Sequence, residues 1–221
     1  MYYRSYLEMV IRDLTFTVGK NERIGIVGHT GAGKSSVPYA LVGLAEPASG
    51  QSIIDGVVIS TIGLQDLRSH IAIIPEDPVL FEGVIPNNLN TANKHTDNEV
   101  WAAINADQIS NILYTPTEKT LLWRRKIILL DETTVNMGTK TDQIMQDVVR
   151  HEFKECTMLT IAHCLGTIMN SDRILVMDYG QIAEFDTPGN IFTDKNSYFL
   201  QLVKSVELNH VYPIEHIVSK N

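Results

Sequence analysis

One eight-residue segment constrains the fold of this chain more than any other. It reads Gly28-His29-Thr30-Gly31-Ala32-Gly33-Lys34-Ser35, fits the pattern G-x-x-x-x-G-K-[ST], and follows the apolar run Ile24–Val27. Glycines let the main chain turn sharply and come close enough to a polyphosphate for backbone N–H groups to surround it. The segment therefore predicts a phosphate-binding loop between a strand and a helix, although an ordinary glycine-rich loop is the alternative.

The residues of this loop have separate expected roles toward a nucleoside triphosphate. The ammonium of Lys34 is placed to reach the terminal phosphates, and the hydroxyl of Ser35 to bind Mg²⁺. The helix after the loop directs the positive end of its dipole at the anion. The residues expected to bind the nucleotide here are Gly28, His29, Thr30, Gly31, Ala32, Gly33, Lys34, Ser35 and Ser36.

Charge and hydropathy restrict the class of protein further. The 221 residues carry a formal net charge of −8, which argues against nucleic acid as a partner because phosphate contacts need clustered lysine and arginine. No apolar run reaches the roughly 20 residues of a membrane span, and the start lacks a signal-peptide core. We expect a soluble chain. Cys156 and Cys164 are too far apart for a redox pair, so we expect reduced thiols that pack as small apolar residues.

Strand and helix signals alternate along the chain and predict an α/β fold, a mostly parallel sheet with helices on both faces plus an antiparallel layer. We expect one domain over residues 1–208 and a loosely held tail over residues 209–221. The expected strands are Val10 to Val18, Ile24 to Val27, a hairpin around Asp55-Gly56, Ile71 to Ile74, Lys126 to Leu130, Thr157 to Ala162, and a pair around Tyr179-Gly180. The expected helices are Asp97 to Asn111, Thr141 to Phe153, and a final helix with Tyr198, Phe199, Leu202, Val203 and Val206 on one face.

Two further strand ends carry polar residues suited to phosphate chemistry. The strand Lys126 to Leu130 ends in Asp131 and Glu132. We expect Asp131 to bind Mg²⁺ and Glu132 to orient and deprotonate an attacking water; the alternative is a helix N-cap pair. His163 follows the strand Thr157 to Ala162, so it could reach the terminal phosphate or the water, because ligands bind at the carboxyl edge of parallel sheets. A surface or core histidine is the alternative there.

Four segments together resemble the nucleotide-binding domain of ATP-binding cassette (ABC) transporters, a P-loop NTPase fold. They are Gly28 to Ser35, Ile73 to Phe81, Leu129 to Glu132 and Leu159 to His163. Three others are similar to the second such domain of the multidrug-resistance-associated, or C, subfamily of exporters: Ile62 to Arg68, Cys156 to His163 and Glu184 to Pro188. The similarity runs from Tyr3 to Val203. It implies ATP and Mg²⁺ as ligands and Tyr3 as the aromatic residue on which adenine stacks; a solvated tyrosine is the alternative.

The chain also departs from the family pattern. A signature of the Leu-Ser-Gly-Gly-Gln type is missing, and the helical sub-domain, about residues 86–125, is truncated. Glu76 stands where the family has a glutamine on Mg²⁺, and can still ligate the ion. Gly138 stands where it has an aspartate that contacts the other domain. Pro38, just past the first turn of a helix opened by Lys34, would crowd the Lys34 carbonyl at a cost of up to about 3 kcal/mol.

The resemblance implies a head-to-tail pair of such domains, each closing the ATP site of the other with its signature, together with transmembrane domains on other chains. The expected location is the cytoplasmic face of a membrane. Two functions follow. One is ATP hydrolysis that powers export of organic anions or xenobiotics, with Lys34, Glu132 and His163 as catalytic residues. The other is a truncated module that holds ATP weakly or only keeps the fold. A P-loop kinase or GTPase fits poorly.

Overall fold

The computed structural model describes residues 9–45, 47–75, 96–106, 125–131, 151, 153–162 and 165–204. Most of the expected helical sub-domain and the whole expected tail lie outside these ranges, as does most of the expected helix from Thr141 to Phe153. Within them, no helix is long and apolar enough to cross a membrane.

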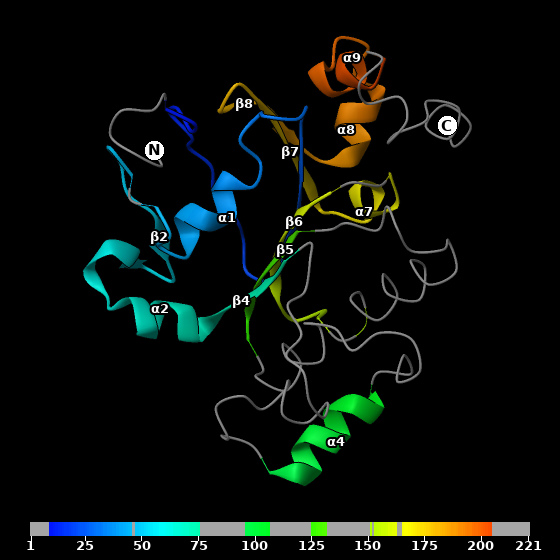
Figure 1. The fold of residues 1–221 in the computed structure, drawn as a ribbon. Helices are drawn as coiled ribbons and strands as arrows, with labels where there is room; N and C mark the ends of the chain where they lie inside the picture. The colour runs from blue at the N-terminus through cyan, green and yellow to red at the C-terminus, as the bar shows by residue number, and fades with distance from the viewer. Residues whose placement is uncertain are drawn as a thin grey trace.

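A six-stranded sheet forms the centre of the fold (Figure 1). Its order is β4-β5-β6-β1-β7-β8. The neighbours from β4 to β7 pair in parallel, and β8 pairs antiparallel with β7. The mostly parallel sheet predicted from the sequence is thus confirmed. Its strands are β1 (Arg23–Val27), β4 (Ile71–Ile74), β5 (Ile127–Asp131), β6 (Thr157–Ile161), β7 (Arg173–Asp178) and β8 (Gln181–Asp186).

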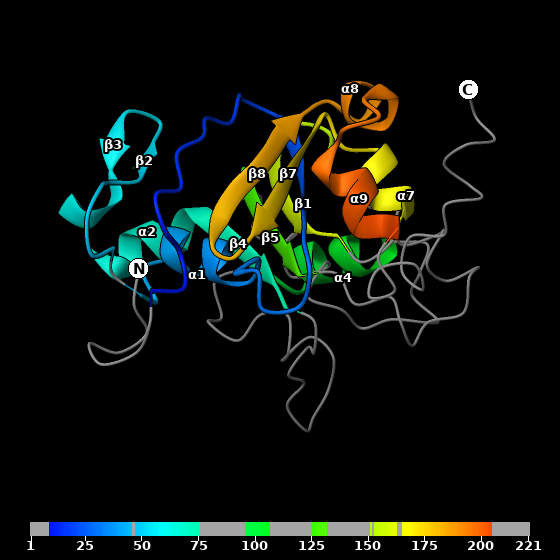
Figure 2. The same cartoon turned by 90° about the horizontal axis from the view of Figure 1, so that it is seen from above.

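Helices cover both faces of this sheet. Two views at right angles show α1 (Ser36–Leu41) and α2 (Leu64–His70) on one side, and α7 (Leu165–Met169) and α9 (Tyr198–Lys204) on the other (Figures 1 and 2). The short helix α8 (Pro188–Thr193) links β8 to α9. A further helix, α4 (Asp97–Ala106), lies apart from the sheet.

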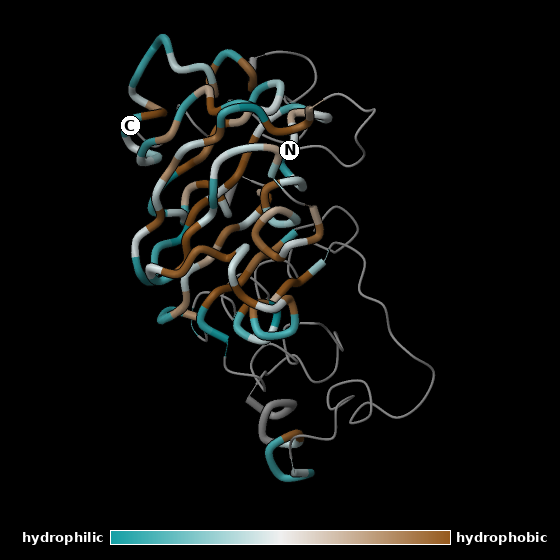
Figure 3. Tube along the Cα trace, turned by 90° about the vertical axis from the view of Figure 1, so that its left-hand side faces the viewer, coloured by the Kyte–Doolittle hydropathy of each residue, from teal (hydrophilic) through white to brown (hydrophobic). Residues whose placement is uncertain are grey.

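The core is divided between the two faces by the alternation of side chains along each strand. In β1, Ile24 and Ile26 belong to the apolar cluster under α1 and α2, whereas Val27 belongs to the cluster under α7 and α9. Figure 3 shows hydrophobic stretches of the chain running through the middle of the described part. Strands buried on both faces appear in a sequence as continuous apolar runs, which is why the sequence reveals them.

The final helix has the apolar face expected from its spacing. Phe199 and Val203 are fully buried against the sheet, and Tyr198 and Leu202 are partly buried beside them. Glu184 of β8 caps the start of this helix, since its carboxylate accepts the backbone N–H groups of Tyr198 and Phe199. Val206 lies outside the described residues.

Cys156 fills a third apolar cluster with residues of β4, β5 and β6. Its thiol is free and buried, and this burial raises its pKa. The packing role expected for Cys156 is confirmed, whereas Cys164 lies outside the described residues.

Both predicted turns are present. Asp55 and Gly56 have φ of 49° and 81° between β2 (Ile53–Ile54) and β3 (Val57–Val58), which pair antiparallel. Tyr179 and Gly180 have φ of 43° and 79° between β7 and β8. Two consecutive residues at positive φ are typical of a tight hairpin turn. The two turns join the antiparallel pairs β2–β3 and β7–β8, which are the antiparallel pairing expected from the sequence.

The prediction of a strand from Val10 to Val18 is wrong. The described residues of this segment form no strand, and Asp13 has a φ of 52°, a left-handed conformation that interrupts extended backbone. Leu14, Phe16 and Val18 still pack against the core, so the apolar pattern reflects burial without strand pairing.

The prediction that Pro38 destabilises the helix after the phosphate loop is also wrong. Helix α1 begins at Ser36 and not at Lys34, so Pro38 is its third residue. N–H groups in the first turn of a helix have no acceptor within the helix, so a proline there removes no helical hydrogen bond.

A partly buried ion pair ties the start of β1 to the start of β7. The Arg173 Nη2 donates to Glu22 Oε2 at 2.8 Å, and the side chains are 28% and 16% exposed. The guanidinium also lies 4.1 Å from the centre of the Phe185 ring. Its hydrogen bond is the main cause that lowers the pKa of Glu22.

We expect Glu22→Gln to lower the free energy of unfolding at pH 7 by about 1 to 2 kcal/mol, because it leaves a half-buried arginine without its carboxylate. A lowered pKa means that the stabilisation is present above the ordinary glutamate pKa of about 4 and is lost as the pH falls through the lower pKa of the folded state. Denaturant unfolding of variant and wild type should therefore converge in acid. Glu155→Gln is the control, since Glu155 is 71% exposed beside Lys126; an equal loss there would contradict the argument.

Candidate nucleotide-binding site

The predicted phosphate-binding loop leaves the carboxyl end of β1, in the middle of the sheet. A β-carbon at Gly28 would lie 2.4 Å from the carbonyl oxygen of Met177 in β7, so only glycine fits there. Gly31 and Gly33 have φ of 85° and 95°, the left-handed region that glycine tolerates. The loop then passes through Ser35 into α1. The expected strand, loop and helix are present in that order.

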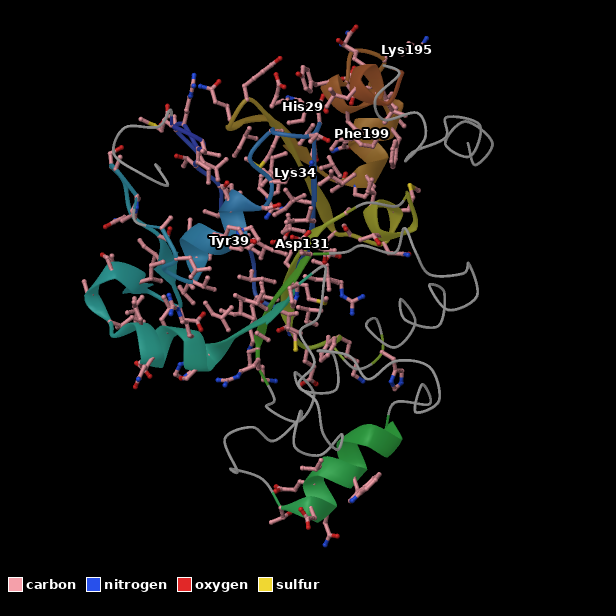
Figure 4. All side chains as sticks on the ribbon, viewed as in Figure 1. His29, Lys34, Tyr39, Asp131, Lys195 and Phe199 are labelled. Carbon is pink, nitrogen blue, oxygen red and sulfur yellow. The ribbon has the colours of Figure 1, made fainter. Side chains whose placement is uncertain are left out.

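Lys34 lies over the beginning of its own loop. Its Nζ donates to the carbonyl oxygen of Gly28 at 2.8 Å and to that of His29 at 3.0 Å. Burial lowers the pKa of Lys34, and the charge of Asp131 acts in the opposite direction. Figure 4 shows Lys34 and Asp131 at the end of the sheet where β1 and β5 terminate.

The strand register explains why Asp131 is near the loop. Ile161 of β6 pairs with Ile26 of β1 on one side and with Asp131 of β5 on the other. Asp131 is therefore level with the last residues of β1, one strand removed. Parallel strand pairing thus brings Asp131 close to the loop although about a hundred residues separate them in the sequence.

These features fit a magnesium nucleotide. A glycine cradle, an ammonium group and a carboxylate meet at one edge of the sheet, and a hard cation such as Mg²⁺ takes oxygen ligands while phosphates take N–H donors and lysine. Ser35 is exposed at the start of α1, so its hydroxyl is accessible, whereas Ser36 is buried. Among the described residues, no group of three or more His, Cys, Asp and Glu could hold a metal ion by itself.

Four other predicted site residues, Tyr3, Glu76, Glu132 and His163, lie outside the described residues, as does Gly138. Their roles stay predictions. The residue before His163 is placed, however: the N–H of Ala162 donates to the Ile26 carbonyl oxygen at 3.0 Å.

The structure adds contacts that the sequence did not indicate. The Nε2 of His29 lies 2.9 Å from Oδ1 of Asp178 at the end of β7, and the ring lies 5.0 Å from that of Tyr179. The N–H of Gly180 donates to the Ala32 carbonyl oxygen at 3.0 Å. The turn between β7 and β8 therefore contacts the phosphate loop. The pair Tyr179-Gly180 predicts a hairpin turn, but nothing in the sequence indicates what the turn touches.

A parallel sheet with helices on both faces and a glycine-rich loop after its central strand is the fold of P-loop nucleoside triphosphatases. Comparison with known proteins narrows this class. The family model described as ABC transporter matches residues 11–135. The chain therefore belongs to the ABC transporter family.

Relatives place the chain in the C subfamily. Multidrug resistance protein mrp-7 of Caenorhabditis elegans is 42% identical over 225 residues, which cover 91% of this chain and 15% of that protein. ATP-binding cassette sub-family C member 2 of Rattus norvegicus is 38% identical over 222 residues, which cover 90% of this chain and 14% of that protein. The chain thus spans about a seventh of the length of these relatives, as one nucleotide-binding domain.

A solved structure supports the fold. The structure described as a bacterial Atm1-family ABC exporter with ATP bound superposes with a TM-score of 0.79 and 28% sequence identity. The superposition covers 87% of this chain and 38% of that one.

We expect Gly28→Ala to weaken Mg-ATP binding by about tenfold or more, since the loop must move away from Met177 and a shift of about 1 Å is costly at such a site. Gly50→Ala is the matched control: Gly50 has a φ of 79°, and no atom lies within 4 Å of the position that a β-carbon would take there. It should cost about 1 to 2 kcal/mol of stability for the left-handed backbone and leave binding unchanged. Calorimetric titration and thermal unfolding separate the two effects, and equal affinity of both variants would contradict the cradle.

Proposed function

We propose that this chain is the ATP-binding domain of an ABC exporter and couples ATP binding and hydrolysis to transport of organic anions or xenobiotics across a membrane. The observation that carries the proposal is the position of the Lys34 ammonium on the carbonyls of Gly28 and His29, with the carboxylate of Asp131 acting on it. A lysine held over a glycine-rich loop between a strand and a helix is the arrangement that receives the terminal phosphates of a nucleotide.

The proposed roles follow the expected chemistry. Lys34 positions the terminal phosphates, and Asp131, Ser35 and Glu76 hold the Mg²⁺. Glu132 orients and deprotonates the attacking water, and His163 contacts the terminal phosphate or that water. When bound, Mg-ATP supplies the phosphoryl group that is transferred to water. The residues contribute by positioning and by electrostatics more than by covalent chemistry.

Stacking on Tyr3 and the main-chain contacts of the loop would bind the rest of the nucleotide. Aromatic rings hold a base by its π-face, which needs no hydrogen bond. Because the chain represents a small share of its relatives, the proposed complex includes a second nucleotide-binding domain in a head-to-tail pair and transmembrane domains on other chains. The pair would lie at the cytoplasmic face of the membrane.

A second candidate is a nucleotide-binding module without turnover of its own. The sequence runs from Trp101 to Ile112 and through Tyr114 to Lys119 into Leu121 without a signature of the Leu-Ser-Gly-Gly-Gln type. The alignment with the nematode relative runs over 225 residues although it takes in only 91% of this 221-residue chain. It therefore contains positions for which this chain has no residue. A pair of identical chains would then lack the element that closes each site.

We expect the purified 221-residue chain to bind Mg-ATP modestly and to release negligible phosphate. A ligand at ten times its Kd stabilises the folded state by about 1.4 kcal/mol, so binding appears as a rise in the melting temperature. Lys34→Ala should remove that rise. Lys126→Ala is the matched control, because Lys126 is 72% exposed and precedes β5 at the end opposite Asp131, and it should keep the rise.

The two candidates differ in phosphate release. Turnover that Lys34→Ala abolishes and Lys126→Ala preserves would contradict the module without turnover. If Mg-ATP gives no melting shift with the unmodified chain, the first candidate is wrong, and of the second only a truncated module that keeps the fold without binding nucleotide is left.

A further inference from the structure

The turn between β7 and β8 is anchored at the phosphate loop. A β-carbon at Gly180 would lie 2.1 Å from the Val10 carbonyl oxygen, so this turn is packed closely against a neighbouring segment. From it, Gly180 donates to the Ala32 carbonyl oxygen, and Asp178 contacts His29. One contact is made by main chain alone, and the other depends on two side chains that can change charge.

Both ring nitrogens of His29 face oxygen atoms at hydrogen-bonding distance. Its Nδ1 lies 2.7 Å from the carbonyl oxygen of Thr30, and its Nε2 lies 2.9 Å from the carboxylate of Asp178. A carbonyl oxygen and a carboxylate oxygen only accept, and a neutral imidazole has a single N–H. Both contacts are hydrogen bonds only when the ring carries two protons and a positive charge.

Asp178 is itself held from a third element. The phenol of Tyr198, at the start of α9, hydrogen-bonds to Asp178. Burial, and then this bond, raise the pKa of Tyr198 to about 12, so it remains a neutral donor at physiological pH. Asp178 is 24% exposed and His29 is 16% exposed, which limits the competition from water.

We propose that Asp178 is a positioning residue for the phosphate loop and acts by holding a protonated His29 across the start of that loop. The proposal rests on nucleotide binding at the loop. The groups around His29 are Asp178 on β7, Tyr179 in the turn, Lys34 on the loop, and, through these, Tyr198 and Asp131. Loss of the second proton removes one of the two hydrogen bonds and leaves Asp178 without a cationic partner.

Imidazole is the side chain that changes charge between about pH 5 and pH 8. A loop ordered by imidazolium should therefore bind nucleotide more tightly at the acidic end of this range, since ordering the loop in advance lowers the cost of binding. The probe is Mg-ADP, which needs no turnover, titrated by calorimetry into the 221-residue chain from pH 6 to pH 8.5.

We expect Asp178→Asn to weaken Mg-ADP binding at pH 6 by about three- to tenfold, the size of one hydrogen bond to a charged group, and to flatten the pH profile relative to wild type. His29→Gln should give a flat profile at weak affinity. His29→Arg keeps a permanent cation and should give a flat profile at tight affinity. Comparing each variant with wild type cancels the titration of the nucleotide itself.

Asp66→Asn is the matched control. Asp66 faces His70 on α2 at 3.8 Å, and these side chains are 68% and 74% exposed. The pair has the same chemistry without burial and without contact to the loop, so the pH profile should not change. A purely general effect of removing a surface carboxylate would appear in both variants and would contradict the proposal.

A ligand-free measurement tests the pair directly. In nuclear magnetic resonance spectra recorded at pH 6, the ring N–H protons of His29 should exchange with water more slowly in wild type than in Asp178→Asn, because the wild-type carboxylate accepts one of them. Equal exchange rates in the two proteins overturn the proposal, as does tighter Mg-ADP binding by Asp178→Asn with an unchanged pH profile, which would mean that His29 acts on the nucleotide directly. Absence of Mg-ADP binding by wild type contradicts the proposed function and, with it, this inference; Lys34-dependent binding that ignores Asp178 contradicts only the inference.

Discussion

The close approach of Gly28 to β7 is the contact on which the site depends. A β-carbon at Gly28 would lie 2.4 Å from the carbonyl oxygen of Met177. Because Gly28 has no β-carbon, the main chain can pass this close to β7 as it turns out of β1. That turn directs the loop across the carboxyl edge of the sheet, where Lys34 folds back over it. Because β1 lies between β6 and β7, the loop is bounded by residues from both sides. The position of β1 in the sheet thus determines which distant residues the loop meets.

The sequence was sufficient where structure depends on local signals. Parallel strands buried on both faces are continuous apolar runs, so β1, β4, β5, β6 and β7 were recognised, and Asp55-Gly56 and Tyr179-Gly180 identified their turns. The phosphate loop was recognised because its backbone needs glycine, at Gly28 for a close contact and at Gly31 and Gly33 for positive φ. Asp131 was placed correctly at a strand end, and the register of β5 with β6 explains its proximity to Lys34.

The sequence was insufficient where a segment is buried in the core without pairing as a strand. The segment from Val10 to Val18 is apolar because it covers the core, yet Asp13 at positive φ prevents a strand. Helices α2, α7 and α8 were not predicted because each is at most seven residues long, too short for a clear 3.6-residue period. Of the three, α8 has a side-chain cap at its start: the Thr187 hydroxyl accepts the Asn190 N–H, and Pro188 follows as the first helical residue. The contact between His29 and Asp178 spans 149 positions, and no local pattern encodes it.

These contacts explain how a chain with a net charge of −8 can present a site for an anion. Two side chains of the loop face a carboxylate from another strand: the charge of Asp131 of β5 acts on Lys34, and Asp178 of β7 contacts His29. While the carbonyl oxygens of Gly28 and His29 hold the Lys34 ammonium, the two carboxylates lie beside the loop before any ligand is present. They also weaken the local positive potential, so the loop must rely on N–H groups and on bound Mg²⁺ for much of its attraction. The means of attracting an anion are therefore local, the N–H groups of the loop and the ammonium held over its first carbonyls, and do not require a positive charge on the domain as a whole.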